Sequence, residues 1–165
     1  MVDLVVAVGA LDPDDLDRAA SESRGSAGSA PASADVEAGW TPRQVLAHVL
    51  WWHERYINVL SSAVDGRTPP KLAGALDDIN VRGVEAYGDR PVEDLTRSLE
   101  TKQHVMESLT SVLFELPRSE REAIVIRTRD DATPVDLDGF VARVTGHLHG
   151  HAHGIREGRD GRAAV

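Results

Sequence analysis

The start of a helix is clearly indicated by the stretch Gly39-Trp40-Thr41-Pro42-Arg43-Gln44-Val45-Leu46-Ala47-His48. Thr41 is a favourable N-cap residue, Pro42 suits the first helical position, and Gln44 is placed to complete a capping box. From Val45 to Leu60 the apolar side chains recur on one stripe that is about 120° wide, and the histidine that ends the quoted stretch lies inside it. The pattern predicts an amphipathic helix that turns one histidine toward the core.

Further helices are predicted on the C-terminal side of this one. A shorter helix is expected over residues 72–87, and the leucine-rich run 92–116 predicts one long helix. Residues 124–128 are β-branched and predict a short extended stretch, after which the last helix begins near Thr133 or Asp136. These amphipathic segments, with scarcely any strand signal, predict an all-α, antiparallel up-and-down four-helix bundle with a short extra helix.

The length of 165 residues fits a single domain. We expect residues 1–22 to form an irregular or short first helix and residues 23–39, rich in Ser, Gly and Ala, to form a flexible loop. Residues 40–157 then make up the main body of the bundle, and residues 158–165 are expected to be a frayed tail.

The composition argues against several classes of function. The chain has no cysteine, which excludes a disulfide framework, a thiolate metal site and a cysteine nucleophile. A formal net charge of -9 opposes phosphate backbones, so nucleic acid is not an expected partner. The apolar start Leu4–Val8 lacks a basic flank and is soon followed by acidic residues, which is typical of neither a signal peptide nor a membrane span. We therefore expect a soluble, cytoplasmic protein without a membrane partner.

The last predicted helix contains four histidines in the run His147-Leu148-His149-Gly150-His151-Ala152-His153. They form two pairs with the same four-residue spacing, and helical phase distinguishes them. His147 and His151 fall within about 60° of Val144 and the other apolar side chains, whereas His149 and His153 fall at about 140° and 180°. The inward-facing pair is therefore predicted to be His147 and His151, one turn apart on one face.

Together with His48, this pair provides three nitrogen ligands and leaves an open position on a bound ion, which is typical of a reactive metal site. Burying three neutral imidazoles without partners would cost roughly 1 to 3 kcal/mol each, and a shared divalent ion satisfies one nitrogen of each. The alternative is a histidine-rich helix end with incidental metal affinity.

Other candidate residues carry weaker signals. We expect His53 and His104 to be half-exposed residues and not a fourth ligand. Trp52 is expected in the core, whereas Trp51 and Tyr56 are candidates for a ligand pocket or an interface. The sequence identifies no catalytic side chain.

From about Gly39 to Ile155 the chain resembles the DinB-like superfamily of four-helix-bundle metalloproteins, including its ClbS/DfsB-like branch. The segments that carry the resemblance are Gly39–His48, Asp78–Asn80, Tyr87, Arg90-Pro91 and His147–Ile155. The resemblance implies that His48, His147 and His151 bind a divalent metal such as zinc or nickel. It also implies a first helix longer than this chain offers, so that a thinly covered flank favours either a homodimer or partial disorder there.

The resemblance implies activities as well as a metal site. Members of the superfamily include metal-dependent thiol transferases that use low-molecular-weight thiols, hydrolases, and proteins that open an electrophilic ring. We therefore predict a metal-dependent hydrolase or thiol transferase that attacks an electrophilic small molecule through a metal-bound hydroxide or thiolate, in detoxification or self-resistance. The alternatives are a non-catalytic bundle that binds or sequesters a small molecule, and a bundle in which the metal is purely a structural staple.

Overall fold

The computed structural model describes residues 7–11, 15–17, 40–68, 72–127 and 133–163. The bounded helices in these ranges are α3 (Pro42–Val64), α4 (Leu76–Tyr87), α5 (Val92–Phe114), α6 (Arg118–Ala123) and α7 (Leu137–Ala163). The described part contains no strand, and an isolated antiparallel bridge pairs Ile126 with Val135. The predicted all-α fold is confirmed.

Helix α3 begins where the sequence predicted because its capping box is formed. Thr41 Oγ1 accepts a hydrogen bond from the Gln44 backbone N–H at 3.2 Å, and Gln44 Oε1 accepts one from the Thr41 backbone N–H at 2.9 Å. The predicted apolar stripe is buried along the whole helix. Helix α3 packs against α4, α5 and α7, and it is therefore the central element of the bundle.

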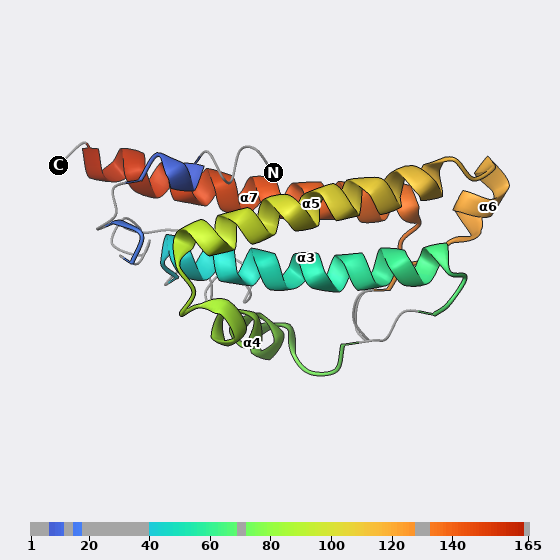
Figure 1. Ribbon diagram of the computed structural model, residues 1–165, viewed down its shortest axis with the longest axis horizontal. Helices are drawn as coiled ribbons and strands as arrows, with labels where there is room; N and C mark the ends of the chain where they lie inside the picture. The colour runs from blue at the N-terminus through green and yellow to red at the C-terminus, as the bar shows by residue number, and fades with distance from the viewer. Residues whose placement is uncertain (1–6, 12–14, 18–39, 69–71, 128–132, 164–165) are drawn as a thin grey trace.

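Helices α3, α5 and α7 lie alongside one another, and the shorter α4 crosses the N-terminal half of α3 (Figure 1). Helix α7 runs antiparallel to α3, because His48 contacts His147 while Tyr56 contacts Phe140. Helix α5 runs parallel to α3 (Figure 1). This order differs from a simple up-and-down bundle, because α4 returns the chain to the start of α3 before α5 begins.

The helix boundaries differ from the predicted ones in two places. The short helix α6 was not predicted, although Pro117 at its start and the four-residue spacing of Arg118 and Glu122, whose side chains are joined at 2.7 Å, indicate one. Helix α7 begins after Asp136, as predicted, but its backbone remains helical to Ala163, where we expected a frayed tail. Adding residues to an existing helix is far easier than nucleating one, which favours continuation of the α7 backbone through these residues.

One apolar cluster joins the helices and contains most of the predicted core residues. Its fully enclosed members are Leu46, Ala47, Val49, Leu50, Val59, Leu60, Ile79, Leu95 and Leu99. Ala7 and Val8 from the start of the chain are buried in the same cluster. The predicted loop 23–39 and most of the first segment lie outside the described residues, so the short first helix and the homodimer stay predictions. None of the described helices is both long and apolar enough to cross a membrane.

Candidate metal centre

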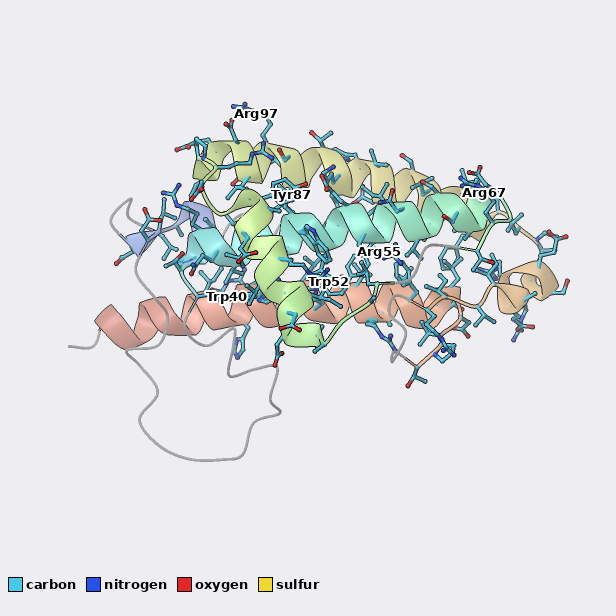
Figure 2. The ribbon with its side chains drawn as sticks, turned by 90° about the horizontal axis from the view of Figure 1, so that it is seen from below. Trp40, Trp52, Arg55, Arg67, Tyr87 and Arg97 are labelled. Carbon is cyan, nitrogen blue, oxygen red and sulfur yellow. The ribbon has the colours of Figure 1, made fainter. Side chains whose placement is uncertain are left out.

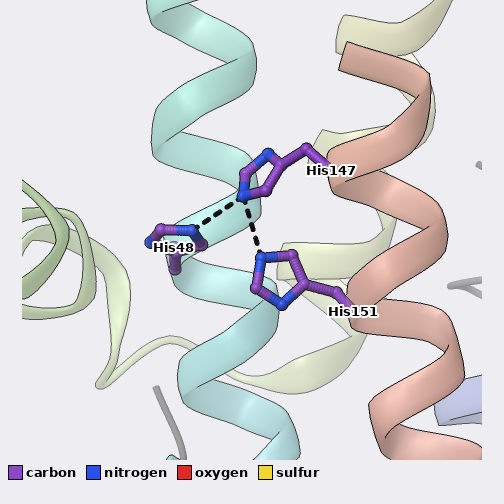
Figure 3. Close-up of side chains that lie close together, drawn as sticks. All are labelled: His48, His147 and His151. Carbon is purple, nitrogen blue, oxygen red and sulfur yellow. Dashed lines mark hydrogen bonds between the residues drawn. The ribbon is translucent and has the colours of Figure 1, made fainter. Parts of the chain in front are cut away.

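The packing of α7 against α3 brings together three histidines that are far apart in the sequence. Phe140, 1% exposed, places its ring edge-on to Tyr56 with a centroid separation of 5.5 Å, and this contact fixes one end of the α3–α7 interface. Two turns farther along the same face of α7, His147 and then His151 point toward His48 on α3 (Figure 3). The predicted inward-facing pair is the pair that meets His48.

The three Nε2 atoms converge on one point. His147 Nε2 lies 3.2 Å from His48 Nε2 and 2.9 Å from His151 Nε2, and one ring nitrogen from each residue lies within 4.8 Å of the others (Figure 3). Three nitrogens at about 2.05 Å from one tetrahedral ion would be about 3.3 Å apart. The observed spacing therefore matches a shared divalent cation after only small side-chain movements.

Hydrogen bonding among the rings does not account for this arrangement. An imidazole nitrogen carries either one proton or one lone pair, so His147 Nε2 can form one normal hydrogen bond and not two. In addition, His147 Nδ1 is buried and has no hydrogen-bond partner. A cation that accepts a lone pair from each Nε2 would satisfy all three nitrogens at once.

The electrostatics of the cluster keep its histidines neutral. Burial, reinforced by the two neighbouring histidines, lowers the pKa of His48 to about 2, although a hydrogen bond with the Asn80 backbone opposes this shift. Burial and then the nearby His151 lower the pKa of His147 to about 3, and burial lowers the pKa of His151 to about 4. At neutral pH the imidazoles therefore have lone pairs available for a metal without first losing a proton.

Aromatic side chains enclose the cluster on the α3 side. The Trp40 ring centroid lies 4.9 Å from that of His48, and the Trp52 ring lies 6.4 Å from both His48 and His147. Trp52 Nε1 donates a hydrogen bond to Asn80 Oδ1 at 3.1 Å, which ties α4 to this side of the site. These indoles restrict the orientation of His48 and exclude water from one side of the cluster.

The two predicted pocket residues lie in helix contacts. Trp51 is half-buried and meets Trp52 edge-on at 5.3 Å, and a Cβ atom added at Gly83 of α4 would lie only 3.2 Å from Trp51 Cβ. Tyr56 is 6% exposed, and its ring stacks on Trp52 at 5.6 Å. Both side chains hold α3 against its neighbours, and a role in a ligand pocket stays a prediction.

The remaining histidines fall outside the cluster, but neither of the two that were expected to be half-exposed is so. His149 and His153 are exposed on α7, and the His104 side chain is 82% exposed. His53 is completely buried, and its Nδ1 lies 2.8 Å from the Val49 carbonyl oxygen. The expectation for His53 was wrong because α5 packs on the side of α3 that carries this residue. The apolar stripe of α3 alone predicted that side to lie near solvent.

The predictions from sequence gave no role to three residues that lie on or beside α3. Trp40 immediately precedes the N-cap, where an apolar residue commonly packs on the first turn, so this position carried a readable signal. Asn80 gave no signal of its contacts with His48 and Trp52, because they depend on how α4 crosses α3. Arg55, which is 7% exposed, has a residue type that is ordinarily at the surface.

Comparison with known families identifies the superfamily to which this chain belongs. The model of the DinB superfamily matches residues 3–155, a range that includes all three clustered histidines. Comparison with curated proteins and with solved structures gives no match. Members of this superfamily often bind metal, and the three convergent imidazoles can hold a divalent ion. The match spans most of the sequence, and the chain belongs to the DinB superfamily.

Proposed function

We propose that this protein binds zinc or nickel through His48, His147 and His151 and acts as a metal-dependent hydrolase or low-molecular-weight-thiol transferase on an electrophilic small molecule. Detoxification or self-resistance is the context that such chemistry would serve. The observation that supports the proposal is the convergence of three neutral Nε2 atoms, which no fourth ligand from the described residues joins. Such a donor set leaves a coordination position open, as catalytic sites do.

The residues around the triad have separable tasks. A divalent ion held there would supply a Lewis-acid centre that lowers the pKa of a water or thiol at the open position. His48 is fixed by Trp40 and by the backbone of Asn80, so its Nε2 remains directed at the other two histidines. His147 and His151 are only partly buried, which leaves the α7 side of the cluster within reach of a small molecule.

The first test is elemental analysis of the untagged full-length protein and of three variants. We expect close to one divalent ion per chain in the native protein and in His149→Ala, and almost none in His48→Ala and His147→Ala. His149→Ala is the matched control, because it removes an exposed histidine from the same helix. Absence of metal in the native protein after incubation with zinc, nickel or manganese would contradict the proposal.

The second test distinguishes the two reactions. The metal-loaded protein is incubated with an epoxide and a chloro-aromatic probe, with and without a low-molecular-weight thiol, and products are identified by mass spectrometry. Turnover that needs the thiol indicates a transferase, and turnover with water alone indicates a hydrolase. A metal-loaded protein as active as its His147→Ala variant would show that the triad is not the reaction centre.

A further inference from the structure

Arg55 on α3 is a buried charge that has no anionic partner among the described residues. The residue is 7% exposed, and its Nε and Nη2 atoms are both enclosed without a hydrogen-bond partner. Burial lowers the pKa of Arg55, and no carboxylate in the part of the chain that the structure describes offsets that effect. A guanidinium remains protonated in proteins, and leaving an ion buried and unpaired is unfavourable. A folded protein tolerates this arrangement when the charge has a ligand to bind.

Three other arginines of the described part have carboxylate partners at the surface. Arg43 contacts Asp17 at 2.6 Å, Arg97 contacts Asp94 at 3.2 Å, and Arg67 is paired with Asp65. Their side chains are between 26% and 74% exposed. Arg55 therefore differs from these three in two respects, because it is enclosed and no described residue provides its counter-ion.

The position of Arg55 relates it to the histidine triad. It follows His48 by seven residues, which places it two turns along α3 on nearly the same face, about 10 Å farther along the helix axis. Trp52, whose ring lies 6.4 Å from both His48 and His147, comes between them on that face. Figure 2 shows Trp52 and Arg55 on the same side of α3, between α3 and α7.

We propose that Arg55 binds a carboxylate or phosphate group of the small molecule that reacts at the histidine triad. This inference rests on the proposed function and adds the substrate class: an anionic molecule whose charged group lies about two helical turns from its reacting atom. The planar guanidinium fits either anion through two parallel N–H donors, and Nη1 is not among its enclosed nitrogens. The anionic group belongs to the electrophile or to the thiol.

The binding test uses inorganic phosphate and succinate as probes with the full-length protein at constant ionic strength. We expect a saturable rise in Tm with each anion, and Arg55→Gln should weaken the fitted binding about 10- to 100-fold, as loss of a charged hydrogen-bonding partner does. The control is Arg97→Gln, which removes an exposed arginine and should leave binding unchanged. No saturable effect, or an equal effect in Arg55→Gln, would overturn the proposal.

A second measurement tests whether a carboxylate of the chain itself is the anion. Asp130 and Asp131 lie outside the described residues, and both are changed to Asn with and without Arg55→Met. If a ligand is the anion, Arg55→Met leaves the folding equilibrium constant unchanged or raises it, independently of the aspartate changes. The proposal is refuted if Arg55→Met and the aspartate changes each lower the folding equilibrium constant more than tenfold and the combined variant loses no more than either. Such non-additive losses would identify an internal ion pair.

Metal content and steady-state kinetics separate this inference from the proposed function. The Arg55→Gln protein should contain as much metal as the native protein, so failure of the metal site would appear in elemental analysis and not in anion binding. Once a reaction is found, Arg55→Gln should raise the KM for the reactant that carries the anion and leave the KM of the other reactant unchanged. That comparison also identifies the electrophile or the thiol as the anionic reactant. Unchanged KM values for both reactants would overturn the proposal.

Discussion

The two histidine pairs of α7 have the same spacing and opposite surroundings. His147 and His151 meet His48 inside the bundle, whereas His149 and His153 are exposed on the other side of the same helix. The difference arises from helical phase, since a shift of two residues rotates a side chain by about 200°. A four-residue spacing therefore makes a pair of ligands possible, and the apolar side chains beside the pair decide whether it joins a buried site.

The inward face of α7 should contribute most to stability. Phe140 is 1% exposed and contacts Tyr56, so Phe140→Ala should lower the free energy of unfolding by about 3 to 5 kcal/mol through lost burial and a cavity. Thr145→Ala, at an exposed position of the same helix, should change it by less than about 0.5 kcal/mol. Urea unfolding of both variants checks the comparison, and equal values would show that α7 has no distinct core face.

The inward histidines should make the metal-free protein sensitive to acid. Burial holds the pKa of His151 at about 4 and that of His147 at about 3, below the ordinary 6.5. The unfolded chain then binds protons that the folded cluster does not, so stability is fully present above pH 6.5 and falls as the pH decreases from there toward 4. Each buried histidine contributes a loss of about 1.4 kcal/mol per pH unit.

Urea unfolding between pH 5 and 8 measures this dependence. Below pH 6.5, His151→Gln should reduce the slope of unfolding free energy against pH by the equivalent of about one bound proton. The exposed-face change His153→Gln should keep the slope of the native protein. The interpretation is wrong if the two variants show the same slope.

The start of α7 should have a smaller effect. Asp136 Oδ1 accepts a hydrogen bond from the Gly139 backbone N–H at 2.8 Å and so caps the helix that carries both pairs. Asp136→Ala should cost about 1 kcal/mol in the free energy of unfolding, and Asp136→Asn, which retains an acceptor oxygen, should cost much less. Thermal unfolding of the two variants tests the cap, and an equal loss in both would indicate that the charge of Asp136 matters more than its hydrogen bond.

The smallest expected signal is proton release during metal binding. At pH 6.5 three ordinary histidines would release about 1.5 protons when they bind an ion, because half of each is protonated. The buried triad is already neutral, so its imidazoles should release none. Titration of the metal-free protein with zinc in weakly buffered indicator solution measures the number. His149→Ala should give the native result, and a release near 1.5 protons would show that the cluster is solvated before the metal arrives.

Local patterns were sufficient for the helices and for much of the site. The capping box at Thr41, the buried stripe of α3 and the inward orientation of His147 and His151 all follow from interactions within a few residues. Each depends on backbone hydrogen bonds near a helix end or on the 3.6-residue period, which the sequence displays directly. For these features the predictions were confirmed.

Features that depend on neighbouring helices were predicted poorly. His53 is buried because α5 covers it, and the parallel order of α3 and α5 follows from the path of α4. Arg55 is enclosed although its residue type favours solvent. None of these outcomes has a local signal, because each depends on contacts between residues that are distant in the chain.

Sequence patterns alone specify an all-helical chain, the start of its central helix and the choice between two equally spaced histidine pairs. Only the tertiary structure decided that His48 reaches a pair 99 and more residues away and that Asn80, Trp40 and Trp52 enclose it. It also placed an unpaired arginine two turns from the triad. The physical reason is that helix formation depends on short-range hydrogen bonds and periodicity, whereas a binding site depends on how the faces of different helices pack together.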